Sequence, residues 1–401
     1  MTNFDYDVLI IGGGLAGGCL ALALAGSPLK VAVVESSTEA ERQAAPAGAR
    51  ALALARGTAR ILETLGVWAA VEPKATPIRH IHVSDRGHFG KTRLSAEREG
   101  VAALGYVATA RDVEDAVIGA LHAGSVELIQ PARLIGLRAG PDSVHVSLRR
   151  GEEALTLSAR LVVGADGSDS TVRRLLEIPQ IVREYGQTAL VFEVSCELEH
   201  RNVAYERFTS SGPLAVLPLG RRRCSVVWTL APSDAEELRA VPEGEFLARL
   251  QDAFGYWLGT LGPVGPRQSF PLRLIRGGRM ADDRVVLIGN AMHQLHPVAG
   301  QGFNLGLRDA ARLAERLIVK QGFGEDIGDP AFLHSYAEAR QRDLGSTVAF
   351  TDSLIRLFSS DFPPLALMRN IGLLTLDCLP PAKHLLARHA MGLAERLPRF
   401  R

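Results

Sequence analysis

The sequence lacks several features that would point to particular classes of protein. It has only four cysteines, which are far apart and form no Cys-x-x-Cys pair, so neither a metal site nor a redox dithiol is predicted and a reducing compartment is expected. Its net charge of +1 gives no indication of the positively charged surface that binds nucleic acid. No uninterrupted apolar run approaches the ~18 residues of a membrane-spanning helix, and no internal repeat or low-complexity segment is present.

A targeting signal and a second dinucleotide motif are also missing. Residues 6–11 already form an apolar strand pattern, so no signal peptide is expected. We predict a cytoplasmic protein, with a peripheral position at the inner face of the membrane as the alternative. Only one strand-linked G-x-G-x-x-G occurs, which disfavours architectures with two dinucleotide domains. The length of 401 residues suffices for two or three domains, or for one interleaved unit.

The single dinucleotide motif follows the first predicted strand. Glycines in this spacing allow a tight turn, the approach of backbone to a pyrophosphate, and close packing of the next helix on the strand. Glu35 ends the next predicted strand, 18 positions after the third glycine, where the acid that binds a ribose diol is expected. The sequence therefore predicts a dinucleotide site, and a glycine-rich turn without a ligand is the alternative. The motif consists of Gly12, Gly14 and Gly17, with Leu15 and Ala16 inside it.

A second glycine-rich loop lies near the other end of the chain. Residues 284–288 predict a short buried strand, which breaks at Gly289-Asn290 and leads to an amphipathic helix that begins near Asn304. Closely spaced glycines let the backbone approach a flat ligand, and the amide end of the following helix favours negative charge. Such a loop suits a ring that becomes anionic during turnover, as a reduced flavin does.

The order of the predicted elements indicates an α/β fold, in which a Rossmann-like nucleotide-binding domain is interleaved with an antiparallel sheet. We assign residues 1–75, 101–182 and 271–330 to the nucleotide-binding domain, because strands and helices alternate there as in βαβ units. Residues 76–100 and 183–270 form the expected substrate domain, a β-sheet. Residues 331–401 form a C-terminal helical segment.

Three separated motifs together resemble one family. They are the first glycine motif with Glu35, residues 164–173 (Gly-Ala-Asp-Gly-Ser-Asp-Ser-Thr-Val-Arg), and the loop 289–309. In combination, over essentially the whole chain, they resemble the single-component aromatic hydroxylases that use FAD, the family of para-hydroxybenzoate hydroxylase. The loop and the tail segments 351–358 and 369–374 look most like the ubiquinone-biosynthesis branch, and within it like the 2-polyprenyl-6-methoxyphenol hydroxylases.

The resemblance implies non-covalently bound FAD, NAD(P)H as the co-substrate, and cofactor contacts at the matching positions. The first motif would hold the pyrophosphate, Glu35 the adenosine ribose, and residue 290 the flavin-side ribose or ribityl chain. The wider family has Gly-Asp where this chain has Gly289-Asn290; an amide oxygen still accepts a hydrogen bond from a hydroxyl, without the charge. The implied cofactor-binding residues beyond the first motif are Arg50, Arg111, Asp166, Gly289, Asn290, Pro297, Gly300, Gln301, Gly302 and Asn304.

The implied reaction is the hydroxylation of a polyprenylated (methoxy)phenol in ubiquinone biosynthesis by O2, through a flavin C4a-hydroperoxide. The cofactor supplies the reactive oxygen and the protein supplies position and dryness, so no catalytic side chain is singled out. His293, His296 and Pro297 are candidates to lie against the flavin, and a loop histidine bonded to backbone is the alternative for either histidine. Another aromatic substrate, a flavin-dependent isoprenoid reductase and a non-catalytic FAD-binding scaffold are the other functions left open.

Further expectations concern the substrate side and the surface. The substrate is expected against the strands at 190–194 and 214–218, with no individual residue singled out. Residues 221–223, three arginines, predict a solvated turn, and a contact to an NADPH phosphate is the alternative. Asp309 is expected to have a structural role, and Cys224 is expected to pack in the sheet.

The C-terminal segment is basic and amphipathic. From residue 353 to residue 401 the sequence has seven Lys or Arg and three acids, and Pro-Pro pairs at 363–364 and 380–381 divide it into short helices. Such a segment suits the surface of an anionic membrane. The alternatives are packing on a partner in a ubiquinone-biosynthesis complex, on a second copy of the chain, or as a cap over the FAD-binding domain.

Overall fold

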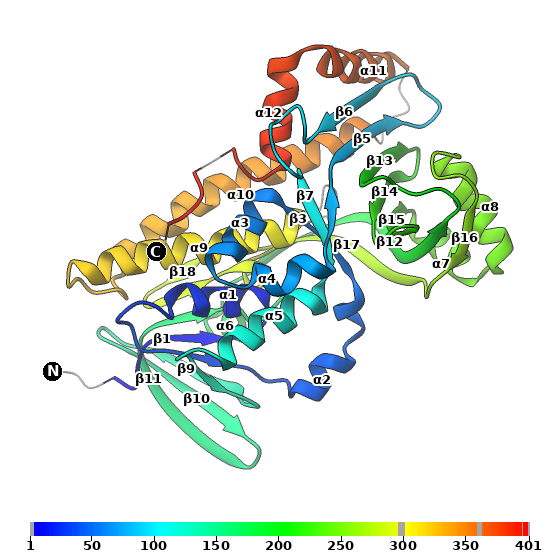
Figure 1. Cartoon of the computed structure of the whole chain (residues 1–401). Coiled ribbons are helices and arrows are strands. Elements are labelled where there is room, and N and C mark those ends of the chain that lie inside the picture. Colours follow the sequence, from blue (N-terminus) through cyan, green and yellow to red (C-terminus); the bar gives the residue numbers. More distant parts are fainter. Residues whose placement is uncertain (1–3, 296–300, 359–362, 395, 400–401) are drawn as a thin grey trace.

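The computed structural model describes residues 4–295, 301–358, 363–394 and 396–399. They form two large β-sheets, which lie at opposite ends of the molecule, with a small third sheet and a set of long helices between and over them (Figure 1). The C-terminal helices reach from the first sheet to the second (Figure 1).

The first sheet is built around a parallel core with the strand order β18-β19-β11-β1-β2-β8. Its strands read as near-continuous Val, Ile, Leu and Ala because both of their faces are covered, and every side chain of β2 and β19 is buried. The bounds are β1 Tyr6–Ile11, β2 Val31–Val34, β8 Glu127–Ile129, β11 Glu153–Gly164, β18 Ala281–Asp282 and β19 Val285–Leu287.

Helices and an antiparallel meander cover this parallel core. Helices α1 (Leu15–Leu24), α5 (Ala110–His122) and α9 (Gln301–Gly322) share one hydrophobic core with β1, β11 and β19. The first half of β11 continues into a meander with β10 (Val144–Arg150) and β9 (Arg133–Ala139), whose apolar side chains belong to the same core. The connecting helices are α2 Glu39–Ala44, η1 Pro46–Ala49, α3 Arg56–Thr64, α4 Trp68–Val71, η2 Glu72–Lys74 and α6 Thr171–Leu175.

The second sheet is almost wholly antiparallel, with the order β20-β17-β12-β15-β14-β13-β5-β6. Helices α7 (Pro232–Ala240) and α8 (Glu243–Phe254) cover one face, where Phe246 and Phe254 pack on alternate residues of the strands. The strands are β5 His80–Asp85, β6 Lys91–Ser95, β12 Gln180–Cys196, β13 Val203–Thr209, β14 Gly212–Pro218, β15 Arg223–Leu230, β16 Leu261–Val264, β17 Gln268–Gly277 and β20 His293–Gln294.

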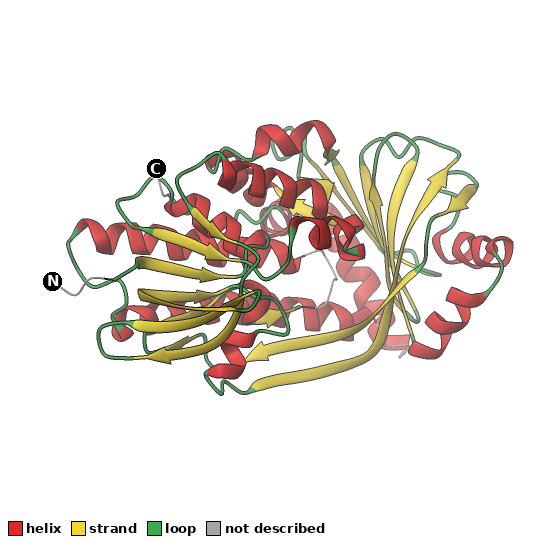
Figure 2. Cartoon of the chain, turned by 90° about the horizontal axis from the view of Figure 1, so that it is seen from below, coloured by secondary structure: helices red, strands yellow, loops and turns green. Residues whose placement is uncertain are grey.

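Two long strands connect the sheets. β12 and β17 pair over most of their length and extend out of the second sheet toward the first (Figure 2). The small sheet, with β3 (Ala51–Ala55), β7 (Gly105–Thr109) and β4 (Thr76–Ile78), contributes Ala51, Val107 and Ile78 to a core shared with β13 and β14. The interleaving of the two units is therefore built from shared strands and a shared core.

The C-terminal helices are part of the molecule's body. α10 (Pro330–Phe358) crosses from the first sheet to the second, and α11 (Pro363–Cys378) and α12 (Pro380–Ala390) pack on β5 and β6 (Figure 1). Arg369 and Asn370 of α11 both donate to Asp85 of β5, at 2.8 and 3.1 Å. Within the described ranges, no helix combines the length and hydrophobicity required to span a bilayer.

The architecture confirms the predicted fold class, an α/β unit interleaved with an antiparallel sheet and followed by C-terminal helices. The division at particular residue numbers stays a prediction. The expected boundaries after residues 182 and 270 fall inside β12 and β17, because these strands belong to the second sheet at one end and reach the first at the other.

Candidate functional site

The three glycine-bearing motifs lie side by side at one edge of the first sheet. They follow β1, β11 and β19, which are adjacent and parallel, so their carboxyl ends meet. The Ala165 N–H donates to the Ile11 carbonyl (2.7 Å), and the Ile288 N–H donates to the Gly164 carbonyl (2.9 Å). In open α/β sheets, ligands bind at the carboxyl ends of the strands, so this edge is the candidate cofactor site.

The glycines of the first motif have the geometry that their predicted roles require. Gly12 has a φ of +106°, and a Cβ there would lie 2.5 Å from the Ala165 oxygen, so only glycine fits. A Cβ on Gly17 would overlap the Gly12 carbonyl, which fixes how closely α1 approaches the strand. Gly14 is exposed at the start of α1 with no atom within 4 Å of its Cβ position, which leaves room for a phosphate at the helix N-terminus. Leu15 and Ala16 form the first turn of α1, where amide N–H groups lack helical partners.

Glu35 is bound by the loop that it adjoins. Its Oε2 accepts a hydrogen bond from the Gly13 N–H (2.8 Å), and its Oε1 accepts one from the Ser37 N–H (2.7 Å). The carboxylate therefore lies next to the first motif, as its spacing predicted. Its contact with a ribose stays a prediction.

The second motif is held by its own charged residues. Asp166 accepts hydrogen bonds from the Ser170 hydroxyl (2.6 Å) and the Thr171 N–H (2.7 Å), so its carboxylate caps α6. Arg173 is buried and donates to the carbonyls of Ser168 (2.6 Å) and Ala291 (2.7 Å). Arg173 thus ties the second motif to the third, a role that the sequence did not indicate although the residue ends the motif.

Gly289 and Asn290 form the turn that follows β19. Gly289 is buried with a φ of +56°, and a Cβ there would lie 3.0 Å from that of Ala16 in α1. Asn290 is exposed, and its side chain makes no hydrogen bond in the described part of the chain. The amide is therefore free to bind a hydroxyl of a ligand at this edge, as predicted for the ribityl chain.

A buried charge network joins the turn after β19 to α9 and α10. Asp309 of α9 accepts hydrogen bonds from the Gly289 N–H (3.2 Å) and Arg340 Nε (2.8 Å), and its Oδ2 lies 2.6 Å from His293 Nε2. His293 and Asp309 are each 1% exposed. Burial alone would raise the pKa of Asp309, but the adjacent His293 and Arg340 hold it at about 2.

This network agrees with the structural role expected for Asp309. The side chain of His293 is bonded to a carboxylate, so the alternative that it bonds to loop backbone is wrong for its Nε2. Its Nδ1 is buried without a partner among the described residues, and a contact with the flavin stays a prediction. Arg340 lies on another helix, 31 positions beyond Asp309, and no local sequence pattern links the two.

The start of α9 is anchored by Asn304. Its Oδ1 accepts from the Ala55 N–H (2.9 Å) and the Thr58 hydroxyl (2.7 Å), and its Nδ2 donates to the Ala53 carbonyl (3.0 Å). The buried side chain therefore joins α9 to β3 and α3, and a contact of Asn304 with the cofactor stays a prediction. Gln301 begins α9, and Gly302 has open space at its Cβ position. His296, Pro297 and Gly300 lie outside the described residues.

Arg50 and Arg111 lie where β3 meets α5. The Ala110 N–H donates to the Arg50 carbonyl (2.9 Å), and the Arg50 side chain is exposed. Arg111 Nη2 donates to the Ala45 carbonyl (2.9 Å), whereas its buried Nε has no partner within the described ranges. An unsatisfied guanidinium N–H, the open cradle at Gly14 and the free amide of Asn290 all fit an anionic dinucleotide.

The chain is similar to known proteins over most of its length. The model of the FAD binding domain family matches residues 5–351. The ubiquinone hydroxylase UbiL of Rhodospirillum rubrum is 42% identical over 392 residues, which cover 96% of this chain and 89% of that protein. The chain belongs to the FAD-dependent aromatic hydroxylases, in their ubiquinone-biosynthesis branch. FAD is its cofactor, and NAD(P)H is the typical co-substrate of the family.

Two further proteins match almost the whole length of this chain. The 3-demethoxyubiquinol 3-hydroxylase of Escherichia coli is 31% identical over 396 residues, covering 98% of this chain and 100% of that protein. The crystal structure of the p-nitrophenol 4-monooxygenase PnpA from Pseudomonas putida superimposes with a TM-score of 0.78 over 97% of this chain and 98% of that one. With 19% identity, it bears on the fold alone.

The second sheet of the hydroxylase has one closed face and one part-open face. The closed face carries Leu190 and Val216, which are buried under α7 and α8. The opposite face carries Val191, Ala215 and Val227, which are all only part-buried. Residues of both predicted substrate segments, 190–194 and 214–218, therefore alternate between a core and an apolar surface on the side of the small sheet.

Two further expectations concern the turn before β15 and β15 itself. Arg221 is 86% exposed and paired with Glu199 at 2.7 Å, as in the solvated turn that was predicted. Cys224 is fully buried in β15, with its sulfur 3.8 Å from that of Cys196, as expected for a residue that packs in the sheet.

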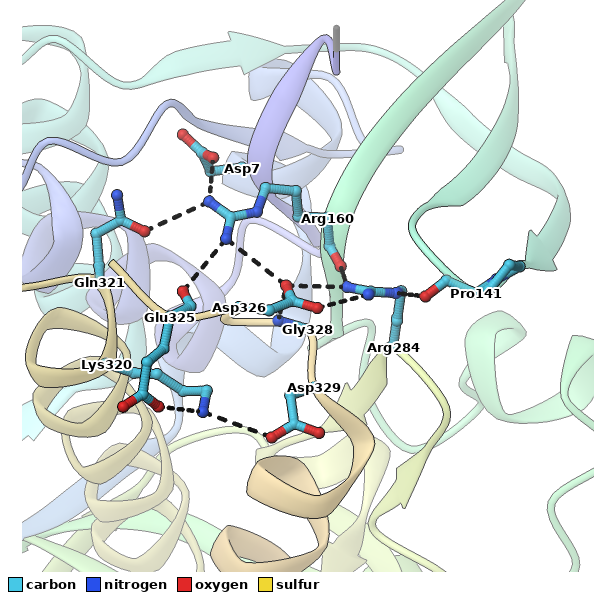
Figure 3. A network of polar contacts seen from close by, with 10 residues as sticks. All are labelled: Asp7, Pro141, Arg160, Arg284, Lys320, Gln321, Glu325, Asp326, Gly328 and Asp329. Atoms are coloured by element: carbon cyan, nitrogen blue, oxygen red, sulfur yellow. Dashed lines mark hydrogen bonds and ion pairs between the residues drawn. The ribbon is translucent and has the colours of Figure 1, made fainter. Parts of the chain in front are cut away.

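The opposite edge of the first sheet carries a network of charged residues (Figure 3). Arg160 of β11 donates to Asp7 of β1 (3.1 Å), and Arg284, directly before β19, donates to Asp326 (3.1 Å) between α9 and α10. A Cβ on Gly328 would overlap the Arg284 guanidinium and the Arg160 carbonyl. Because the network lies at the amino ends of the strands, it stabilises the sheet away from the three glycine motifs.

Proposed function

We propose that the protein hydroxylates a polyprenylated (methoxy)phenol of ubiquinone biosynthesis, with bound FAD, NAD(P)H and O2. The observation that carries the proposal is the convergence of the three motifs at one sheet edge, with the part-open apolar face of the second sheet on the side of β3 and β7. The names of the relatives, ubiquinone hydroxylase and 3-demethoxyubiquinol 3-hydroxylase, support a phenolic or quinol ring as the substrate.

In this proposal the residues of the chain bind and orient the cofactor and shield the site from water. The N-terminus of α1 holds the pyrophosphate, and Glu35 holds the adenosine ribose. The N-terminal end of α9 places its amide dipoles where the ring of the cofactor becomes negative. The Asp309 network holds Gly289 and His293, which follow β19, in one position, and the apolar face of the second sheet excludes water. When bound, FAD supplies the activated oxygen.

The test is an oxygen-electrode assay of the FAD-reconstituted protein with NAD(P)H and short-chain prenylated methoxyphenols. We expect oxygen uptake that depends on the phenol, and a product with one added oxygen by mass spectrometry. Reduction of an isoprenoid double bond without oxygen uptake would favour a reductase. Bound FAD with no oxidation of NAD(P)H in the presence of any phenol would favour a non-catalytic scaffold.

We also propose that α11 contacts the surface of an anionic membrane, from which a polyprenylated substrate would be delivered. Leu367, Met368 and Ile371 of α11 are 55, 69 and 51% exposed, whereas Arg369 and Asn370 between them are buried against β5. The exposed residues therefore form an outward apolar stripe on a basic segment. A second copy of the chain, or a partner in a ubiquinone-biosynthesis complex, could cover the same stripe, and the test must distinguish these from a membrane.

A further inference from the structure

A carboxylic acid lies on the part-open face of the second sheet. Along β13, Ala204, Glu206 and Phe208 alternate onto one face. Ala204 packs with Val107 of β7, and Phe208 stacks on Phe358 at the end of α10, with the ring centroids 3.6 Å apart. Glu206 therefore lies between the small sheet and the C-terminal helices.

The strand that carries Glu206 is connected to the start of α9 through β3. Ala204, two residues before it, shares a core with Ala51 of β3. The same strand supplies Ala53, whose carbonyl accepts the hydrogen bond of Asn304 in the first turn of α9. One strand, β3, thus bonds to the start of α9 and shares a hydrophobic core with the strand that carries Glu206.

The surroundings of Glu206 are apolar. Its neighbours across the sheet are Val83 in β5 and Ala215 in β14, and the row continues with Val227 and Val191. The residue as a whole is part-buried, but its Oε1 is buried and has no hydrogen-bond partner in the described part of the chain. Burial raises the pKa of Glu206 to about 7, with no contribution from a neighbouring charge.

The other charged groups on this face are already paired. Asp85, in the next row, accepts from Arg369 (2.8 Å), and Glu193 lies 3.6 Å from Arg223. Arg207, adjacent to Glu206 in sequence, points to the other face and donates to the Ala253 carbonyl of α8 (3.0 Å). A buried carboxyl group without a partner is costly to keep, and no contact among the described residues compensates for it here.

We propose that Glu206 is the base that takes the hydroxyl proton of the phenolic substrate, an inference that rests on the proposed hydroxylation of a phenol. In this step the phenol O–H bond breaks and its electron pair stays on the ring oxygen. The proton forms a new O–H bond on Glu206. A phenolate has more electron density at its ortho and para carbons, which is what attack by an electrophilic oxygen requires.

The environment suits Glu206 for this task. A phenol has a pKa of about 10, and an exposed carboxylate is a weak base toward it. Removal from water makes the Glu206 carboxylate a stronger base, and a base is most effective when its pKa lies near the working pH. The flanking valines and alanine leave a flat apolar wall for the ring of the substrate.

Glu206→Gln keeps the size of the side chain and removes its ability to take a proton. In the FAD-reconstituted protein we expect unchanged FAD affinity, product formation lower by about 10²–10⁴-fold, and peroxide in place of the lost product. The wild-type product rate should rise with pH around 7 and then level off, whereas the variant should need a pH near that of free phenol ionisation. A fluorinated, more acidic phenol should restore much of the variant's rate.

Glu184→Gln is the matched control, because Glu184 is exposed on the same sheet and paired with Arg273 at 3.4 Å. A Glu206→Gln protein with the wild-type pH profile and coupling overturns the proposal, and so does a loss of rate that phenol acidity does not rescue. If the variant fails to fold, the ultraviolet difference spectrum of phenol bound to the wild type decides: phenolate on binding supports the proposal, neutral phenol above pH 7 overturns it. A wild-type protein that hydroxylates no phenol overturns the proposed function and this proposal together.

Discussion

At the scale of single residues, Asn290 is where this chain departs from the Gly-Asp of the wider family. Its amide is exposed and makes no hydrogen bond among the described residues, so a substitution acts on a ligand with little effect on the fold. We expect Asn290→Leu to weaken FAD binding by about 5-fold, since one hydrogen bond contributes roughly 1 kcal/mol. Asn290→Asp should bind FAD at least as tightly, because a carboxylate accepts more strongly.

Fluorescence titration of the apoprotein with FAD measures both variants of residue 290. Equal affinities for wild type, Asn290→Leu and Asn290→Asp would mean that the residue marks a lineage and does not contact the cofactor. Circular dichroism melts would show whether the fold is unchanged.

Arg340 is a second case in which one residue has a measurable effect. Its replacement leaves the ionised carboxylate of Asp309 without one of its partners. Arg340→Met should lower the free energy of unfolding by about 3–5 kcal/mol, as expected for one partner removed from a buried pair. The folded-state pKa of Asp309 is about 2, below the value of about 3.9 in an unfolded chain. Its contribution to stability is therefore present above pH 4 and is lost as the pH falls toward 2.

Urea unfolding at several pH values measures this effect. The difference between wild type and Arg340→Met should be greatest above pH 4 and should narrow below it. Arg342→Met is the control on the same helix, because Arg342 is exposed. A constant difference across this pH range would contradict the assigned role of Asp309.

At the scale of elements, the two edges of the first sheet have separate tasks. Gly328 lies in the charged network at the amino ends of β1, β11 and β19, opposite the glycine motifs. We expect Gly328→Ala to cost about 1–3 kcal/mol in stability, because a Cβ collides with Arg284 and with main chain. Its affinity for FAD should equal that of wild type once both are folded.

Gly322→Ala, at the end of α9, is the counterpart with open space at its Cβ position. It should be neutral or stabilising by up to about 1 kcal/mol, the difference in helix propensity. Thermal melts and FAD titrations of both variants test whether one edge of the first sheet contributes to stability and the other to FAD binding. A large loss of FAD affinity in folded Gly328→Ala would contradict it.

Elements with strong local signals were predictable from sequence. Residues 109–123 predict a helix, because Thr109 is a suitable cap and acids follow in the first turn. The structure confirms it as α5, where the Thr109 hydroxyl accepts from the Asp112 N–H. The sequence also predicts one helix around residues 243–254, within a run of alternating strands, and it coincides with α8. The long β12 and the short β20 were not predicted in these forms, because their pairing depends on partners distant in sequence.

The same reason limits what the sequence tells about the site. Glycine spacing identified the first motif, because its geometry is local and repeats in many proteins. The bonds of Asn304 to residues 53–58 and of Asp309 to Arg340 join segments that no local pattern links. Glu206 looks from sequence like any polar residue of an alternating strand, and only the packed sheet shows that its Oε1 has no partner among the described residues.

At the scale of the whole molecule, α11 lies at the outer edge of the molecule, beyond β6 (Figure 1). We expect the triple variant Leu367→Ser, Met368→Ser and Ile371→Ser to lose several-fold in flotation with vesicles that contain phosphatidylglycerol. Hydroxylation of a short-chain, water-soluble phenol should be unchanged, because the stripe faces away from β5 and β6. A triple serine variant at Leu155, Ile181 and Val182, which are also exposed, is the control.

Flotation of the triple variant and the wild type to the same extent would contradict the membrane proposal. Wild-type protein that stays at the bottom of the gradient would do so too. A change from dimer to monomer in the α11 variant, seen by light scattering, would show that a second copy of the chain covers the stripe.

The interleaved order of strands has a consequence for how the protein is made. Strand β19, which carries the third motif, pairs with β11, and its loop continues into β20, which pairs with β17. Asp309 and Arg340, which lock that loop, come later still. At a translation rate of about 5–20 residues per second, the first glycine motif waits for tens of seconds before its neighbours exist. The nascent chain therefore has no complete cofactor site during most of its synthesis, and FAD binds at the end of translation or after release.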